Sequence, residues 1–283
     1  MPTTYAHWRF GCDCIDTLPE PLQNIIRSNR EIFDLGVHGP DVFFYDLAHK
    51  DVARHGNEMH HESADVFFEH CVDVYCRSEK DRDAMLSYIL GFLSHYTLDS
   101  QCHAYINTKS KVSGISHNKV ESEYDGHMMR LDGHAVNDLD RADSLRPNAH
   151  IAAVMAEFFP FSGKDLLRTT RMQRFIIGAL NCSSDLKRSG LGKILHRMGK
   201  DDYADLIVQK DEMEICRDSN LRIDKLRENA LKIYPQLAAS LMKRIEDGTP
   251  LCDYFSRNFD PEASDDIPVL SYQDELNYQP EFH

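Results

Sequence analysis

The sequence has no hydrophobic run that approaches the length of a membrane-spanning helix. Its first residues, MPTTYAHWRFG, contain neither the basic stretch nor the apolar stretch of a secretory signal peptide. We therefore expect a soluble protein of the cytoplasm that has no transmembrane segment.

Positive charge is scarce in this chain. Its 283 residues include 32 Lys and Arg against 46 Asp and Glu, which gives a formal net charge of -14 at pH 7. This balance argues against a general nucleic-acid binder and against a protein that binds anionic membranes. We see no Lys/Arg cluster that offsets it, and we expect no stable nucleic-acid complex.

Cysteine is present, but not in the pattern of a disulfide scaffold. Eight cysteines in a chain of this length are expected to be reduced and mostly buried thiols. Cys12 and Cys14 lie two residues apart on an expected helix, so their side chains face different directions. We therefore expect no thiolate metal site.

The two-residue alternation that marks half-buried strands is also missing. Apolar residues recur with helical spacing instead, which predicts an all-α fold, a single-domain multi-helix bundle over residues 1–283. The predicted helices cover residues 6–18, 21–36, 63–78, 81–106, 117–133, 149–159, 163–180, 191–199 and 220–248. The segment 248–283 is rich in proline and acidic residues, and we expect it to be an extended C-terminal tail.

Three polar residues follow the most apolar stretch of the chain. In HYTLDSQCHAYI, His95, Asp99 and His103 recur at four-residue intervals, so they lie one above another on a helix face. His95 and Asp99 can chelate one ion together. A rise of about 1.5 Å per residue separates His95 from His103 by roughly 12 Å along the axis. If all three are ligands, there are at least two metal ions; the alternative is that they are buried and satisfied by ordinary hydrogen bonds.

Ligands for a second ion come next along the chain. The turn-like sequence INTKSKVSGIS leads into HNKVE, which places His117 and Glu121 four residues apart at the start of a helix. A helical hairpin would bring both residues beside His103. Three such ligands with an open fourth position are typical of a catalytic zinc site.

The first pair needs partners, and the N-terminal third offers His7, Asp41 and His60. An isolated Asp after Gly-Pro is usually a turn residue, and an isolated His is usually an ordinary core or surface residue. Their combination with two i,i+4 pairs favours a metal cluster among the helices of the N-terminal half.

The ordered series His7, Asp41, His60, HYTLD, His103 and HNKVE resembles the zinc-dependent phospholipase C and S1/P1 nuclease superfamily over residues 1–123. The resemblance implies an all-α enzyme with three clustered zinc ions that cleaves phosphodiester or phosphomonoester bonds. It implies three ligand sets: Asp41, His60, His95 and Asp99 for the first zinc, His103, His117 and Glu121 for the second, and His7 for the third, with Asp99 as a bridge to the first. Secreted members complete the third site with an N-terminal Trp, whereas the only Trp of this chain is Trp8, inside the first predicted helix.

These inferences predict a metal-dependent phosphoester hydrolase, similar to phospholipase C, that attacks with a metal-bound hydroxide. Asp99 would bridge two ions, and Asp41 would orient or deprotonate the water. We expect two or three Zn2+ ions, although histidine and carboxylate ligands also suit Fe or Mn. The expected substrate is a phospholipid head group or a small phosphodiester, approached across Phe43, Phe44 and Tyr45 if these residues are not core. The alternatives are an S1/P1-like nuclease or phosphomonoesterase and a non-catalytic metal-binding protein, and the oligomeric state stays open.

Overall fold

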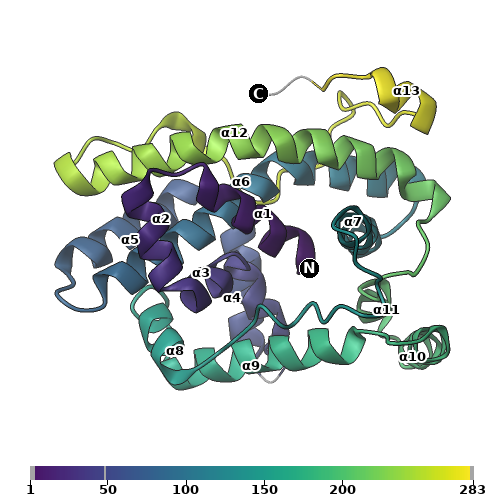
Figure 1. Cartoon of the computed structure of the whole chain (residues 1–283), viewed down its shortest axis with the longest axis horizontal. Coiled ribbons are helices and arrows are strands. Elements are labelled where there is room, and N and C mark those ends of the chain that lie inside the picture. Colours follow the sequence, from purple (N-terminus) through teal and green to yellow (C-terminus); the bar gives the residue numbers. More distant parts are fainter. Residues whose placement is uncertain (1–3, 48, 281–283) are drawn as a thin grey trace.

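Helices make up the regular secondary structure of the protein. The computed structural model describes residues 4–47 and 49–280, and none of these residues forms a strand. The all-α prediction is therefore confirmed (Figure 1). The elements are α1 (Tyr5–Asp16), α2 (Glu20–Ser28), α3 (Arg30–Gly36), η1 (Gly39–Tyr45), α4 (Lys50–His61), α5 (Ala64–Arg77), α6 (Arg82–Ser113), α7 (His117–Leu131), α8 (Ala149–Ala156), α9 (Gly163–Leu180), α10 (Asp185–Arg197), α11 (Asp201–Asp205), η2 (Glu214–Cys216), α12 (Arg217–Asp247), η3 (Asp253–Ser256) and α13 (Tyr272–Asn277).

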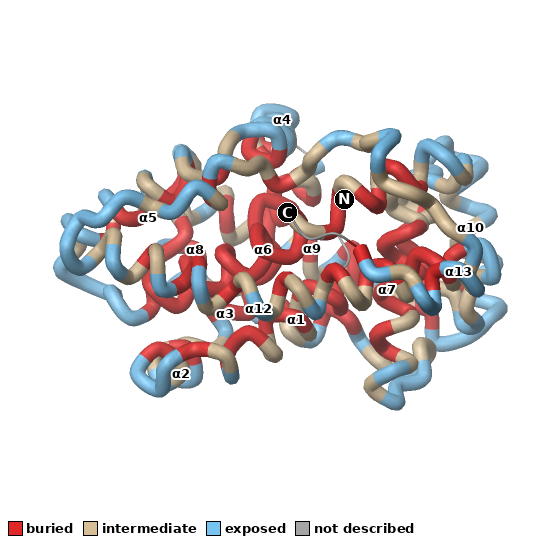
Figure 2. Tube along the Cα trace, turned by 90° about the horizontal axis from the view of Figure 1, so that it is seen from above, coloured by how far each residue is buried: buried red, intermediate tan, exposed pale blue. Residues whose placement is uncertain are grey.

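Helix α6 forms the centre of the fold. Residues 84–100 are buried on every side of the helix, as expected for an apolar helix enclosed by neighbours (Figure 2). Helices α1, α2, α3, α7 and α12 all pack against it. The closest neighbour is α3: a Cβ atom on Gly91 would lie 2.4 Å from the carbonyl oxygen of Phe33, so the two backbones touch there. This enclosure places any polar residue of α6 inside the protein.

The helix pattern differs from the sequence-based prediction at several places, two of which lie in the N-terminal third. The expected helix over residues 21–36 is divided at Asn29, whose backbone (φ -126°, ψ 39°) is not helical. Helix α4 was not predicted at all. Its sequence contains Gly56, at which a Cβ atom would lie 2.9 Å from Cβ of Phe43, so glycine is what lets α4 pack closely against η1.

The segment after Gly248 lies along the helices rather than apart from them. It is mostly irregular, with the short elements η3 and α13, and its Phe255 and Phe259 are buried in the core. The backbone N–H groups of Phe259 and Asp260 both donate to the carbonyl oxygen of His60, each at 3.1 Å. The segment is therefore anchored beside the N-terminal half of the chain.

The cysteines were expected to be reduced and mostly buried, and the structure agrees. All eight cysteines are free, and five of them are buried. Cys76 and Cys252 are exposed, and Cys12 is half-buried. Among the described residues, no helix is both long enough and apolar enough to span a bilayer.

Candidate metal centre

The face of α6 that carries His95, Asp99 and His103 points into the interior. All three side chains are buried, and Asp99 is only 2 % exposed. The Nε2 atom of His95 lies 2.9 Å from Oδ2 of Asp99, and Nε2 of His103 lies 3.4 Å from Oδ1 of the same residue. The four-residue spacing thus places one carboxylate between two imidazoles.

A first cluster forms where α1 and η1 meet this face. Nε2 of His7 lies 3.1 Å from Oδ1 of Asp99, and Oδ2 of Asp41 lies 3.7 Å from Nε2 of His95. One ligand atom from each of His7, Asp41, His95 and Asp99 lies within 4.8 Å of the others. His7 stacks on His95, with 4.3 Å between ring centroids, so its ring lies beside the first cluster and next to Asp99.

His60 reaches the first cluster through Asp41. Its Nε2 atom lies 2.9 Å from Oδ1 of Asp41, and its Nδ1 atom lies 2.7 Å from the carbonyl oxygen of Gly56. His60 is buried, whereas the neighbouring His61 is exposed. The structure therefore brings His60, and not His61, to the site.

A second cluster forms at the hairpin between α6 and α7. Gly114 ends α6 with φ 72°, and Ser116 caps α7 by accepting a hydrogen bond from the Lys119 amide. Helix α7 then presents its first turn to His103. Oε1 of Glu121 lies 3.2 Å from Nε2 of His103 and 3.2 Å from Nε2 of His117. The hairpin expected from the sequence is therefore present.

The Nδ1 atoms of His95, His117 and His103 contact oxygen atoms on the side away from the clusters. Nδ1 of His95 lies 3.2 Å from the Val37 carbonyl oxygen, and Nδ1 of His117 lies 2.7 Å from Oδ1 of Asn107. Nδ1 of His103 lies 3.3 Å from Oδ1 of Asp260. When Nδ1 carries the proton for such a contact, the lone pair of Nε2 faces the cluster, which is the usual arrangement around a metal-binding histidine.

Several buried atoms at the centre lack hydrogen bonds within the described part of the chain. They include Oε2 of Glu121 and Nδ1 of His7. A buried carboxylate oxygen without a partner is costly, and a bound cation would offset that cost. A cavity of about 20 Å³ adjoins His7, Asp99, His103 and Glu121. It has room for about one water molecule or ion. The donor set and the space therefore fit a metal such as zinc.

Charges within the clusters shift the pKa values of their members in opposite directions. Burial acts to raise the pKa of Asp99, but the charges of His103, His95 and His7 outweigh it and hold that pKa well below its usual range. Burial acts to lower the pKa of His103, but Asp99, Asp260 and Glu121 outweigh it and raise that pKa well above its usual range. Without metal, the carboxylates are thus neutralised by protonated imidazoles, and metal ions would take over this role.

Sequence reasoning missed two residues at the centre. Asp260 comes from the C-terminal segment and contacts both His103 and the amide of Asn107, which lies 2.7 Å away. Burial acts to raise the pKa of Asp260, but its hydrogen bond and charge interaction with His103 lower it to about 2. His38 is completely buried, and burial together with the nearby charges of His7 and His95 lowers its pKa to about 3. Asp260 is one of many acidic residues in the C-terminal segment, and His38 is a single histidine before Gly-Pro, so neither residue could be assigned to the site from the sequence.

Two of the three aromatic residues in η1 belong to the core and cannot form an apolar approach to the site. Phe43 and Tyr45 are fully buried, and Phe43 packs against Phe159 with 4.9 Å between ring centroids. Only Phe44 is half-buried, and its ring lies 5.2 Å from that of His60. Among the candidate ligands, His117 is the most open to solvent, with its side chain 24 % exposed. The centre is therefore most accessible at the start of α7.

Comparison with known proteins gives one match. A family model described as zinc dependent phospholipase C matches residues 6–159. This range contains the eight predicted ligands, and Asp260 lies outside it. Searches of curated proteins and of solved structures return no match.

Proposed function

Because the chain belongs to the zinc-dependent phospholipase C family, we propose that it is a metal-dependent hydrolase of phosphodiesters that acts on phospholipid head groups or related small molecules. The observation that carries this proposal is the position of Asp99. It lies between two buried sets of histidine and carboxylate ligands, and it contacts a histidine of each. A shared carboxylate between two ligand sets is suited to paired metal ions.

The proposed ligand sets follow the two clusters. One ion would be held by His7, Asp41, His95 and Asp99, and the other by His103, His117 and Glu121. His60 would either complete the first set or hold Asp41 in place. Two ions are the minimum that this arrangement needs, and a third could be held at His7 with Asp99 as a bridge to the first. Zinc is the proposed metal because the family depends on it and because the ligands are imidazoles and carboxylates without thiolates.

The proposed chemistry divides between the ions and the chain. Bound zinc supplies a lowered pKa for water and positive charge for the phosphoryl oxygens. Asp41 would orient the water. Burial acts to raise the pKa of Asp41, but the charge of His95 and the hydrogen bond with His60 lower it, so the carboxylate stays ionised and can accept a hydrogen bond. His117, the most exposed ligand, marks the side from which the phosphate would enter.

The proposal is tested by measuring metal content together with hydrolysis of three substrates: a chromogenic phosphodiester, a short-chain phosphatidylcholine and single-stranded DNA. We expect about two zinc ions per chain and hydrolysis of the first two substrates. Faster hydrolysis of DNA would instead support the nuclease alternative. Tight zinc binding without hydrolysis of any substrate would support a metal-binding protein without catalytic activity.

Adjacent histidines provide a matched control. His60→Ala removes the ring that contacts Asp41, whereas His61→Ala removes an exposed ring one residue later. We expect His60→Ala to lower hydrolysis by at least about tenfold, the usual cost of removing a residue that holds a metal ligand. His61→Ala should leave hydrolysis unchanged, and equal losses in the two variants would contradict the assigned site.

A further inference from the structure

The negative charge of the chain is unevenly distributed. Residues 163–200 contain nine Lys and Arg and two Asp, a formal charge of +7, within a chain whose total is -14. The expectation that no basic cluster offsets the acidic composition is therefore wrong for this segment. It comprises α9 and α10, which follow one another along the edge of the molecule opposite α12 (Figure 1).

The exposed faces of these two helices combine basic and apolar residues. On α9, the exposed Lys164, Arg171 and Phe175 follow at intervals of seven and four residues, which places them on one face. Phe175 is 69 % exposed. On α10, Leu186 and Lys193 are likewise exposed seven residues apart, and Leu186 is 86 % exposed. Large apolar side chains that stand in solvent among cations are a feature of helices that bind membrane surfaces.

The cations of this face are available, whereas its acids are neutralised. Asp165 lies 2.7 Å from Arg168, and Asp185 lies 2.6 Å from Arg188. By contrast, Lys193 has no hydrogen-bond or ion-pair partner among the residues that the structure describes, and the same holds for Lys164, Arg171 and Arg197. These side chains are therefore available to form ion pairs with an anionic surface.

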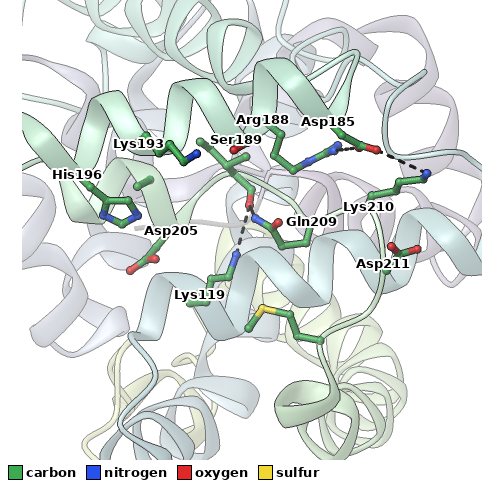
Figure 3. A pocket seen from close by; sticks show the side chains of 14 residues that line it. Lys119, Asp185, Arg188, Ser189, Lys193, His196, Asp205, Gln209, Lys210 and Asp211 are labelled. Carbon is green, nitrogen blue, oxygen red and sulfur yellow. Dashed lines mark hydrogen bonds and ion pairs between the residues drawn. The ribbon is translucent and has the colours of Figure 1, made fainter.

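A hollow at α10 is large enough for a lipid head group. Its volume is about 760 Å³, and it lies between α10 and the start of α7. Figure 3 shows Lys193 of α10 and Lys119 of α7 on its two sides. Lys119 comes two residues after His117 on α7, so the two side chains point to different sides of the helix, and no candidate metal ligand lines the hollow. Asp205 and Asp211 also line it, which favours a head group that carries an amine as well as a phosphate.

We propose that α9 and α10 form a surface that docks on membranes containing anionic phospholipids. The cations would lie among the head groups, and Phe175, Leu186 and Met198 would enter the boundary with the acyl chains. A nucleic acid would meet the same charge, but it offers no environment for exposed Leu and Met side chains. Docking needs no catalysis, so this proposal goes beyond the proposed function and can fail or succeed independently of it.

The test is sedimentation with vesicles. The unmodified protein should bind vesicles of phosphatidylcholine mixed with phosphatidylserine, bind pure phosphatidylcholine vesicles far less, and lose binding as salt is added. Lys193→Gln with Arg197→Gln should weaken binding about 25-fold, since each basic residue near an anionic membrane contributes about fivefold. Leu186→Ser changes a side chain that is 86 % exposed, so it should also weaken binding without disturbing the fold.

The matched control removes the same charge from the opposite edge of the molecule. Lys232 and Lys243 are exposed on α12, and Lys232→Gln with Lys243→Gln should leave vesicle binding unchanged. An equal loss in this control would show that only net charge matters and would overturn the proposal. Failure of the unmodified protein to bind phosphatidylserine vesicles at low salt would overturn it as well. A third result would also overturn it: the protein binds a DNA oligomer more tightly than it binds vesicles, and this DNA binding is lost in Lys193→Gln with Arg197→Gln but kept in Leu186→Ser.

Discussion

Replacing Asp99 with Asn separates a paired-metal centre from an ordinary buried polar cluster. Asp99 lies within 3.4 Å of Nε2 atoms from His7, His95 and His103. Asparagine keeps the shape of the side chain but removes its charge, and its NH2 group cannot bind a cation. The first ligand set therefore loses its shared anion, whereas His117 and Glu121 of the second set are unchanged.

The electrostatic effect of this change is large. Two dications about 4 Å apart at an effective dielectric constant of about 20 repel each other by on the order of 16 kcal/mol. Asp99 is the carboxylate placed to offset this repulsion from both sides. We therefore expect Asp99→Asn to lose the metal of the first set and to lower phosphodiester hydrolysis by at least about a hundredfold, which corresponds to about 2.7 kcal/mol in the activation barrier.

The assay measures metal content, hydrolysis and helical content in the same preparations. Metal at the His103, His117 and Glu121 set should remain, and the fold should be kept because the surrounding helix packing does not change. Asp34→Asn is the control: it removes a buried carboxylate that pairs with Arg30 at 2.7 Å, away from both clusters. Full metal content with near-normal hydrolysis in Asp99→Asn would show that Asp99 does not bridge two ions.

Two further predictions concern the shape and the protonation of the centre. Gly39→Ala should sharply lower metal content, because a Cβ atom there would lie 2.2 Å from the ring of His95. Gly133→Ala is its control, since Gly133 also has a positive φ but no atom within 4 Å of the added Cβ; equal metal loss in both would contradict the clash. Zinc binding at about pH 6.5 should release at least about one proton per chain, because the raised pKa values of His7 and His103 keep these rings protonated without metal. The release should diminish as the pH rises through those pKa values, and a calorimetric heat of binding that is the same in all buffers would refute it.

The part of the centre that was predictable from sequence lies on α6 and α7. A four-residue interval on one continuous helix fixes which side chains share a face, so His95, Asp99 and His103 could be assigned before the fold was known. The short connection to α7 likewise limited where His117 and Glu121 could go. Both arguments depend only on local geometry, and both agree with the observed positions.

The remaining contacts depend on packing between distant segments. Gly39 has no side chain, yet its positive φ of 49° and its close approach to His95 bring the following Asp41 to the cluster. Gly56 plays a similar role for α4 and thereby for His60. Glycine in a sequence indicates conformational freedom rather than a specific conformation, so residue spacing could not locate Asp41 and His60, which were expected at the cluster only from the family resemblance.

The C-terminal segment shows that the matched family region does not build the metal centre alone. Oδ1 of Asp260 lies 3.3 Å from Nδ1 of His103. The centroid of the buried ring of Phe259 lies 6.2 Å from that of His95. The segment is fixed in turn by Tyr254, whose hydroxyl accepts a hydrogen bond of 2.6 Å from the Gln101 amide on α6. Without this segment, His103 would lose its contact of 3.3 Å with the carboxylate of Asp260. Helices α6 and α7 therefore carry the candidate ligands of the second set, and the last part of the chain contacts one of them, His103.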